Sequence, residues 1–405
     1  NVNYCFVGIR RTGKSYMMYQ QIKHLQENGI PLKQIVYVNF EDERLLELSA
    51  DDLNLILEIG LEMSGADNKP YLFLDEIQNV VGWEKFVRRI ADMKYRIHIT
   101  GSNSKMLSSE IASTLGGRFM RVDIYPYSFP EYLAAQGKDK NYLEVLSTKD
   151  RAEVVGMCDQ YVKYGAFPEL VDIRNKREYL NSIYQTIYLG DIMTRNKITN
   201  DFAVIFILKK IAESVAKPLS FNRLSNILKS AGAVLGKQTV INYLGDPFED
   251  SYEELKSVFE GQEYVQKYAA KLVEKETSPK YYFMDTGLLG LMLMDCSSTQ
   301  LENLVAIELI RRYGRENVFY FEKKVEIDFY VPEEKLAIQV SLQVLDQIDT
   351  REREIGACVK LKNFIGDATC LLITNSEEEE LDYDGVHVSV VPVWKWLLQK
   401  RKQDI

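Results

Sequence analysis

The segment Gly8–Ser15 fits the pattern GxxxxGK[ST], and it constrains the fold more than any other feature of the sequence. An apolar stretch, Tyr4–Val7, precedes it, and an amphipathic stretch, Lys14–Asn28, follows it. The segment therefore lies between an expected strand and an expected helix. Glycines in such a loop let successive N–H groups turn inward and form a nest for phosphate oxygens at a helix N-terminus. The motif predicts a P-loop that binds nucleoside triphosphates.

The residue types in this loop suit phosphate and magnesium chemistry. Lys14 is expected to reach the β- and γ-phosphates as a point charge, and the Ser15 hydroxyl to ligate Mg²⁺. The motif therefore predicts ATP and Mg²⁺ as cofactors and Lys14 as a catalytic residue. The candidate nucleotide contacts in the loop are Gly8, Ile9, Arg10, Arg11, Thr12, Gly13, Lys14 and Ser15.

A second apolar stretch ends in two acids. Tyr71–Leu74 is followed directly by Asp75 and Glu76. An Asp at a strand tip beside a P-loop meets the magnesium shell, so Asp75 joins Ser15 as a predicted metal ligand and nucleotide contact. Glu76 is placed to orient or deprotonate the attacking water, and we expect it to be catalytic. An acid in this second position favours hydrolysis over binding alone.

A third strand, Arg96–Thr100, also runs into polar residues. After Gly101 come Ser102 and Asn103, either of which is a candidate contact with the γ-phosphate. The alternative is that this cluster only caps a turn.

The alternation of strands and helices changes along the 405-residue chain, which is long enough for two or three domains. Residues 1–135 alternate short apolar strands with helices and predict an α/β domain with a parallel sheet. Residues 136–285 read as mostly helical, and residues 286–405 return to mixed α/β. The strands expected in the first domain are Tyr4–Val7, Ile35–Phe40, Tyr71–Leu74, Arg96–Thr100 and Phe119–Ile124.

The spacing of three helical stretches within 205–245 suits a helix-turn-helix: Ile205–Ala216, Phe221–Ala231 and Lys237–Leu244. Lys237 heads the last one, where contacts with DNA would arise. Such modules also serve only as packing domains, and the apolar residues at helical spacing fit that alternative.

Charge and cysteine content narrow the class of protein. A net charge of −9 lacks the footprint of a strongly basic nucleic-acid binder, although it is compatible with a local basic face. The five cysteines and three histidines are scattered, which argues against zinc and for a reducing cytoplasm. We see neither a secretory signal nor a long apolar run, so we expect a cytoplasmic protein without a membrane span. The chain begins with Asn1 rather than Met, which predicts residues upstream.

Several motifs together resemble one family, the AAA-type ATPases of bacteria and archaea that carry a C-terminal restriction-endonuclease-like domain. The resemblance spans nearly the whole chain. It rests on FVGIRRTGKS (Phe6–Ser15), VYVNFED (Val36–Asp42), LFLDEIQ (Leu72–Gln78), ITGSNS (Ile99–Ser104), GGRFMRVDIYPYSFPEYL (Gly116–Leu133), YGAFPE (Tyr164–Glu169), YYFMDTGLL (Tyr281–Leu289), EIDFYV (Glu326–Val331) and AIQVS (Ala337–Ser341).

The resemblance implies a five-stranded parallel core with helices on both sides, then a helical lid with a winged-helix-like domain, then the nuclease-like domain. It also implies that Gly165–Pro168 is a lid motif near the nucleotide, which makes Pro168 a candidate contact. Arg118 matches the position of an arginine finger or an intramolecular sensor. On that interpretation Arg118→Ala lowers turnover more than tenfold and leaves ATP binding near normal. The alternative for Arg118 is a salt bridge after a glycine turn.

The nuclease-like domain departs from the pattern of a working nuclease. Such a site needs an acid on one strand, then an acid and a lysine two residues apart on the next. Asp328 fits the first position, and Glu302 fits an auxiliary acid, but the second pair falls on Gln339 and Ser341. An amide is a poor anionic ligand, and serine lacks the lysine charge, so we expect no nuclease activity. Lys323 and Lys324 are left as candidate phosphate contacts or as solvated residues.

The sequence thus predicts a Mg²⁺-dependent ATPase whose nucleotide state controls the attached helical and nuclease-like domains. One alternative is a slow nucleotide-dependent switch or scaffold with little turnover and a protein partner or self-association. A second alternative is a DNA-binding or DNA-processing ATPase.

Overall fold

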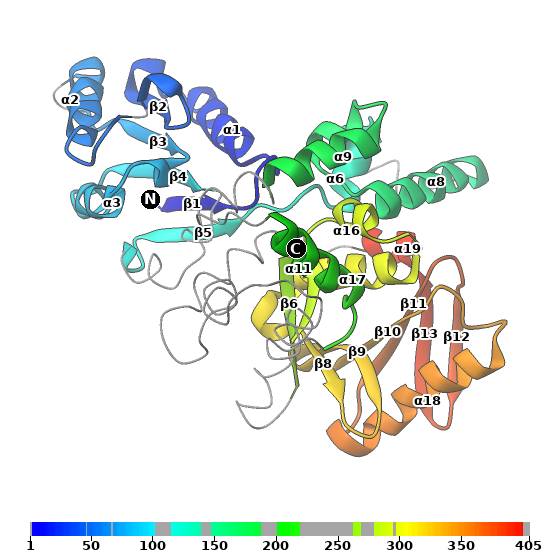
Figure 1. Ribbon diagram of the computed structural model, residues 1–405. Helices are drawn as coiled ribbons and strands as arrows, with labels where there is room; N and C mark the ends of the chain where they lie inside the picture. The colour runs from blue at the N-terminus through cyan, green and yellow to red at the C-terminus, as the bar shows by residue number, and fades with distance from the viewer. Residues whose placement is uncertain are drawn as a thin grey trace. The chain divides into compact units, whose positions relative to one another are not determined.

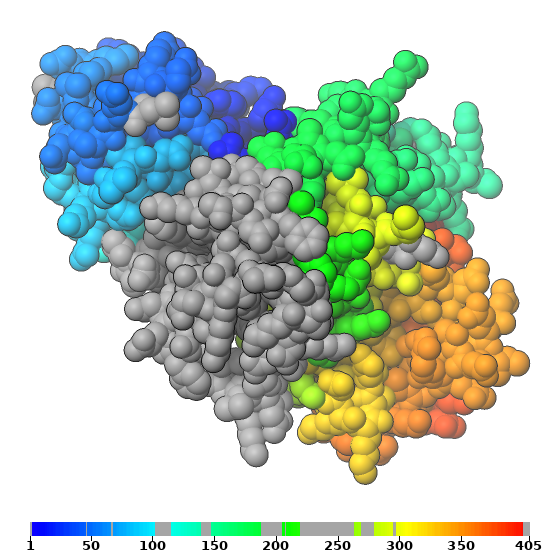
Figure 2. All heavy atoms as spheres, viewed as in Figure 1, coloured from blue at the N-terminus to red at the C-terminus, as the bar shows by residue number. Residues whose placement is uncertain are grey.

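The computed structural model describes residues 2–45, 47–65, 68–101, 115–138, 147–187, 201–218, 262–268, 279–294 and 297–399, which carry colour in Figure 2. The chain divides into two compact units, Asn1–Pro126 and Tyr127–Ile405. Each unit has its own sheet and is described by itself.

The first unit is built on a five-stranded sheet with the strand order β2-β3-β4-β1-β5, in which every pair of neighbours is parallel. The predicted parallel α/β core is therefore confirmed. The strands are β1 (Asn3–Val7), β2 (Ile35–Asn39), β3 (Tyr71–Asp75), β4 (Arg96–Gly101) and β5 (Phe119–Asp123), and the helices are α1 (Lys14–Glu27), α2 (Leu53–Ser64) and α3 (Trp83–Asp92).

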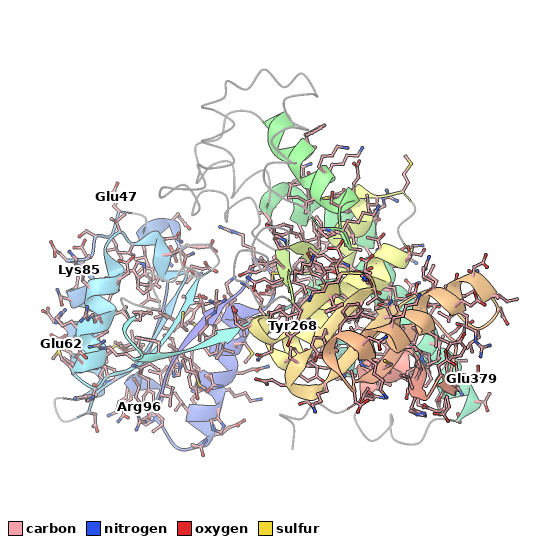
Figure 3. The ribbon with its side chains drawn as sticks, turned by 90° about the horizontal axis from the view of Figure 1, so that it is seen from below. Glu47, Glu62, Lys85, Arg96, Tyr268 and Glu379 are labelled. Atoms are coloured by element: carbon pink, nitrogen blue, oxygen red, sulfur yellow. The ribbon has the colours of Figure 1, made fainter. Side chains whose placement is uncertain are left out.

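Both faces of this sheet are covered, because successive side chains of a strand point to opposite faces. On one face Phe6 and Phe73 pack with Met18 of α1. On the other face Val7 and Leu74 belong to the core that α2 and α3 complete. Figure 1 shows α1 on one side of the sheet and α2 and α3 on the other. All carboxyl ends of the strands meet at one edge, and Arg96, labelled in Figure 3, marks the opposite edge.

The second unit contains an eight-stranded mixed sheet with the order β12-β13-β11-β10-β9-β8-β6-β7. The pairs β10–β11, β11–β13 and β6–β8 are parallel, and the remaining neighbours are antiparallel. The strands are β6 (Gln262–Lys267), β7 (Lys280–Phe283), β8 (Phe319–Glu322), β9 (Glu326–Val331), β10 (Leu336–Val340), β11 (Thr369–Thr374), β12 (Glu379–Tyr383) and β13 (Val386–Pro392). In Figure 3, Tyr268 at the end of β6 and Glu379 at the start of β12 mark two parts of this sheet.

The mixed α/β character expected of residues 286–405 is present. Strand β12 begins at Glu379, within a run of four glutamates, Glu377–Glu380. It is an edge strand whose residues are mostly exposed, so its charges stay in water while its backbone pairs with β13. Strands β6 and β7 come from the stretch expected to be mostly helical, and both join the C-terminal sheet. The second and third helices of the expected helix-turn-helix lie outside the described residues.

The helices of the second unit begin with capping side chains at several places. Ser128 and Glu131 form a capping box on α6, and Ser147 and Asn175 cap α8 and α9. The helices are α6 (Phe129–Ala135), α8 (Thr148–Tyr164), α9 (Lys176–Tyr184), α11 (Asp201–Glu213), α16 (Thr286–Met292), α17 (Ser297–Tyr313), α18 (Ile348–Ile365) and α19 (Val393–Leu398). Within the described part of the chain, none of the helices is both long and apolar enough to cross a membrane.

Asp285 ties two distant segments of this unit together. Its buried carboxylate caps α16 by accepting from Gly287 N at 2.8 Å and also accepts from Ala166 N at 2.7 Å. Gly165 has a φ of 72°, and a Cβ there would overlap this carboxylate. The motifs YGAFPE and YYFMDTGLL therefore meet in space, and we call the contact between Ala166 and Asp285 the clasp.

Candidate nucleotide site

The loop between β1 and α1 has the geometry of an anion cradle. Gly13 is the N-cap of α1 with φ 102°, which favours glycine, and a Cβ on Gly8 would overlap the carbonyl oxygen of Ile124. The N-terminus of α1 has no side-chain cap and no acid in its first turn. Free N–H groups and the helix dipole make such an end suited to phosphate oxygens. Ser15 lies half-buried in this first turn.

Lys14 is buried at the mouth of the loop and turns back on its own neighbours. Its Nζ donates to Ile9 O at 3.1 Å and lies 3.3 Å from Glu76 Oε1. The side chains of Lys14 and Glu76 are only 4% and 9% exposed, so the two buried charges compensate each other. A lysine in this position can transfer to phosphate oxygens only by giving up its contact with Glu76.

Asp75 stands at the carboxyl end of β3 with hydroxyl groups on both carboxylate oxygens. Tyr37 OH donates to Oδ2 at 2.7 Å, and the Thr100 hydroxyl donates to Oδ1. Burial raises the pKa of Tyr37, and its hydrogen bonds with Tyr19 and Asp75 raise it further, so the phenol stays a donor. These two neutral donors hold the carboxylate in position. Asp75 forms no ion pair with any of the described residues, so its negative charge is not compensated by a cation of the fold.

Thr100 links the two acids. Besides donating to Asp75, its Oγ1 accepts from Glu76 N at 2.8 Å. Glu76 itself adopts the left-handed region at φ 52°, a conformation that is uncommon for a residue with a Cβ. Its second oxygen accepts from Gln78 Nε2 at 2.5 Å. The backbone turn and two side chains thereby aim Glu76 at the loop.

The other loop residues hold the loop's own shape. Thr12 Oγ1 donates to Ile9 O at 2.9 Å, and Arg10 forms an ion pair of 2.8 Å with Glu41. Arg11 adopts a left-handed φ of 65° and is exposed. The structure thus brings the loop, Asp75 and Glu76 together at one edge of the sheet.

Three further predicted nucleotide contacts are not part of the described site in the first unit. Ser102 and Asn103 lie outside the described residues. Pro168 begins a 3₁₀ turn in the second unit, beside the clasp. Its role as a nucleotide contact stays a prediction.

Arg118 lies at the opposite edge of the first unit's sheet. It precedes β5, whose first residue pairs with Asn3 at the start of β1, whereas the loop follows the end of β1. The length of this strand separates the two by roughly 16 Å. The guanidinium forms a two-point ion pair with Asp92, with Nε–Oδ1 at 2.6 Å and Nη2–Oδ2 at 3.2 Å. A catalytic role for Arg118 therefore requires the site of a second copy.

Sequence reasoning missed Thr100 and Tyr37. The sequence predicts the strand Arg96–Thr100, but its candidate polar residues, Ser102 and Asn103, come two and three positions after Thr100. The signal for Thr100 is a hydroxyl at the last position of an otherwise apolar strand next to β3. Tyr37 shows no comparable signal, because its hydroxyl crosses from one strand to the next.

A second polar cluster lies on the sheet of the second unit. Asp328 on β9 accepts from Val340 N at 2.9 Å, and Gln339 Oε1 accepts from Asp328 N at 2.7 Å. The amide of Gln339 also donates to Glu354 Oε2 at 2.8 Å. Burial raises the pKa of Asp328 well above its usual range, and the nearby Glu302 adds to the effect. Gln339 therefore links Asp328 on β9 with Glu354 on α18.

Lys280 on β7 supplies a cation to this cluster that the sequence analysis did not consider. It is buried, and its Nζ lies 3.2 Å from Glu326 Oε1. Burial alone lowers its pKa, but Glu302, Asp328 and Glu326 reverse the direction and raise it. Tyr282 OH donates to Glu302 Oε1 at 3.0 Å. Among the described residues, no three His, Cys, Asp or Glu side chains are grouped so that they could hold a metal ion. The expected lack of nuclease activity stays a prediction.

The residues of the first unit suit a magnesium triphosphate. An uncapped helix end, a buried lysine and a carboxylate held by neutral donors supply groups for phosphate oxygens and for a hard cation that prefers oxygen ligands. The parallel sheet and this site define the first unit as a P-loop domain of the AAA type. In agreement, the family model described as an AAA domain matches residues 3–133. A domain of unknown function, DUF8612, matches residues 157–300.

Two relatives match almost the whole chain. The uncharacterized protein MJ1544 of Methanocaldococcus jannaschii is 34% identical over 405 residues, covering 96% of this chain and 87% of the relative. An uncharacterized protein of Haemophilus influenzae is 31% identical over 403 residues, covering 97% and 93%. The chain therefore belongs to the same family as these two proteins.

Solved structures show only a distant likeness. The Orc1 protein of Aeropyrum pernix, solved in complex with DNA, is 15% identical with a TM-score of 0.29 and covers 77% of this chain and 88% of that one. Cdc6p of Pyrobaculum aerophilum is 13% identical with a TM-score of 0.26 and covers 75% and 88%.

Proposed function

We propose that this protein binds ATP with Mg²⁺ in its first unit and hydrolyses the terminal phosphate. The observation that carries the proposal is the meeting of Lys14, Asp75 and Glu76 beside the uncapped N-terminus of α1. Each group has a task in phosphoryl transfer to water.

The residues divide the work by position. The N–H groups of the loop hold the triphosphate, and Lys14 moves from Glu76 to the phosphate oxygens and balances their charge. Ser15 and Asp75 hold Mg²⁺, which supplies charge neutralisation when bound. Glu76, released from Lys14, accepts a proton from the attacking water. Thr100 and Tyr37 keep Asp75 in place for this task.

We further propose that the nucleotide state of the first unit controls the arrangement of the rest of the chain. In this proposal, residues 136–285 form a helical lid and a winged-helix-like domain, and residues 286–405 form a nuclease-like domain without nuclease activity. The AAA domain and the full-length match to both relatives support a single working assembly of these parts.

Steady-state phosphate release by the full chain, with a fluorescent ATP analogue to measure binding, tests this function. We expect Lys14→Ala to abolish both binding and turnover. Glu76→Gln should bind the analogue within about threefold of wild type and lose about 100-fold in turnover. Chelation of Mg²⁺ should stop turnover in the wild type. Wild-type turnover in Glu76→Gln would remove Glu76 from the mechanism.

A slow switch is the second candidate, and the pairing of Lys14 with Glu76 favours it. ATP must break a buried ion pair to bind, and its departure restores that pair, so the site has two charge-balanced states. Fewer than one turnover per bound nucleotide during an hour-long assay would select the switch over the hydrolase.

A further inference from the structure

A large hollow in the second unit lies beside the polar cluster around Asp328, because Val340 and Arg353 contact that cluster and also line the hollow. Its volume is about 1260 Å³, above the range of roughly 300–1,000 Å³ usual for small-molecule pockets. Residues from α8, α9, α11, α16, α17, β10 and α18 line it. Figure 1 shows α8, α9, α16 and α17 gathered in this part of the unit.

The lining is strongly positive in a chain that is negative overall. Among the described lining residues the only acid is Asp159, whereas four are basic: Lys163, Arg177, Lys209 and Arg353. The chain as a whole carries a net charge of −9. A concave surface lined by one sign of charge focuses its potential and attracts ligands of the opposite sign.

Three of these cations are not compensated within the described part of the protein. Lys163, Arg177 and Lys209 form no ion pair with any residue that the structure describes, and the Lys163 ammonium lies 5.2 Å from the ring centre of Tyr164. Arg353 is bound to Glu354, which is shared with Gln339. Many other basic residues, such as Arg312 and Lys395, do pair with acids. Cations kept apart from acids are available to an external anion.

The arrangement points to a polymer rather than to one phosphate group. The cations come from four different helices, so they are spread around the hollow and not gathered on one point. We propose that the hollow binds a short single-stranded segment of nucleic acid, whose backbone carries a negative charge on each nucleotide. A cavity suits a single strand, because a duplex is too wide to enter it.

The remaining lining residues match the bases of such a strand. The side-chain amides of Gln343, Gln347 and Asn375 can exchange paired hydrogen bonds with base edges. The ring of Tyr164, which the ammonium groups of Lys163 and Lys176 approach, and the fully exposed Met294 offer apolar contact area to bases. An acidic peptide would use the cations but not these groups, so the lining favours nucleic acid over such a peptide.

Fluorescence anisotropy of a labelled oligonucleotide of about twelve nucleotides tests the proposal on the full chain. Arg177→Gln with Lys209→Gln removes two exposed cations from the hollow. We expect binding to weaken at least tenfold and the dependence of log affinity on log salt to fall by about 1.4, the value for two phosphate contacts on a single strand. Lys323→Gln with Lys324→Gln makes the same charge change at an exposed turn and should alter neither quantity.

Three results would overturn the proposal. The first is no binding of the oligonucleotide at low salt, and the second is equal weakening by the two double variants. The third is displacement by polyglutamate that needs no higher concentration of negative charges than displacement by the unlabelled oligonucleotide. Turnover of ATP by the Arg177/Lys209 variant in the absence of oligonucleotide should match wild type, so loss of strand binding is distinguishable from failure of the proposed ATPase.

Discussion

Asp75 in the first unit and Asp328 in the second are both acids on a strand of a sheet, yet their surroundings differ in kind. Asp75 ends its strand, accepts from two hydroxyl groups and faces an uncapped helix end. Asp328 lies within its strand, accepts from a backbone N–H and neighbours Gln339 and Lys280, which have partners of their own.

The difference distinguishes a site that can still bind a ligand from a cluster whose polar groups already bind one another. In the first unit, the charges of Lys14 and Glu76 balance each other only until a phosphate takes the lysine. In the cluster around Asp328, the polar side chains that we traced have partners within the fold. Catalytic groups are expected where the fold leaves polar capacity unused, and the same residue types elsewhere serve architecture.

Neutralising each acid should give the largest contrast. We expect Asp75→Asn to lower ATP turnover about 100-fold, because the amide cannot balance the charge of Mg²⁺. Asp328→Asn should leave turnover within twofold and instead change the melting temperature. Phosphate release and thermal unfolding, measured on both variants, decide the matter. A comparable loss of turnover in Asp328→Asn would show that the second cluster takes part in the chemistry.

The pH dependence of stability should isolate the clasp. Burial raises the pKa of Asp285 to about 6, while its backbone hydrogen bonds oppose the rise. The folded state therefore keeps a proton that the unfolded state releases near pH 4. The free energy of unfolding should fall by about 3 kcal/mol as pH rises through this window, and then level off above pH 6.

In Asp285→Asn, the free energy of unfolding should no longer fall over this pH range. It should differ from wild type only by a constant amount that reflects the altered hydrogen bond with Ala166 N. The measurement is urea unfolding from pH 4 to 7, followed by tryptophan fluorescence. Both the wild type and Asp285→Asn carry Trp83→Phe, so that only Trp394 and Trp396 of the second unit report. Parallel pH profiles for the two proteins would show that Asp285 titrates normally.

Removal of the hydroxyls around Asp75 should have a smaller effect. Thr100→Val keeps the shape of a fully buried side chain and deletes the link between Asp75 and Glu76. We expect kcat to fall about tenfold, and Tyr37→Phe to raise the Mg²⁺ requirement about threefold with little change in kcat. Turnover measured against Mg²⁺ concentration separates these effects. An unchanged kcat in Thr100→Val would confine the threonine to packing.

The smallest effect is expected from the ion pair of Arg118 and Asp92. Arg118→Ala and Asp92→Asn should each change the free energy of unfolding only slightly, because water screens this exposed ion pair. Both should leave turnover within twofold in dilute protein. A tenfold loss in Arg118→Ala alone, growing with protein concentration, would place this arginine in the site of a second copy.

The sequence was sufficient to predict those parts of the candidate site that consist of consecutive residues. Gly8–Ser15 and the pair Asp75 and Glu76 could be recognised because strand, loop and helix follow directly along the chain. The parallel sheet followed from apolar strands without alternation. The same local logic predicted the mixed α/β character of residues 286–405.

Contacts across the chain could not be predicted in this way. Thr100 reaches Asp75 only because β4 lies beside β3 in a particular register. Lys280 enters the second cluster from a strand that the helical pattern around it concealed, and it meets an acid 46 residues further on. The hollow combines residues from seven elements. Its positive charge cannot be recognised from any single stretch of the sequence, because its basic residues lie far apart along the chain.

The clasp between Ala166 and Asp285 has a consequence for how the second unit forms. It joins residues 119 positions apart, so the chain must close a long loop before this buried hydrogen bond can contribute. Closing a loop of that length costs conformational entropy, and contacts of such separation slow folding. The helices α8 and α16 that the clasp joins are each short-range structures, but their union is a late event. Refolding of this unit is therefore expected to include a slow step in which α8 and α16 come together and the clasp forms.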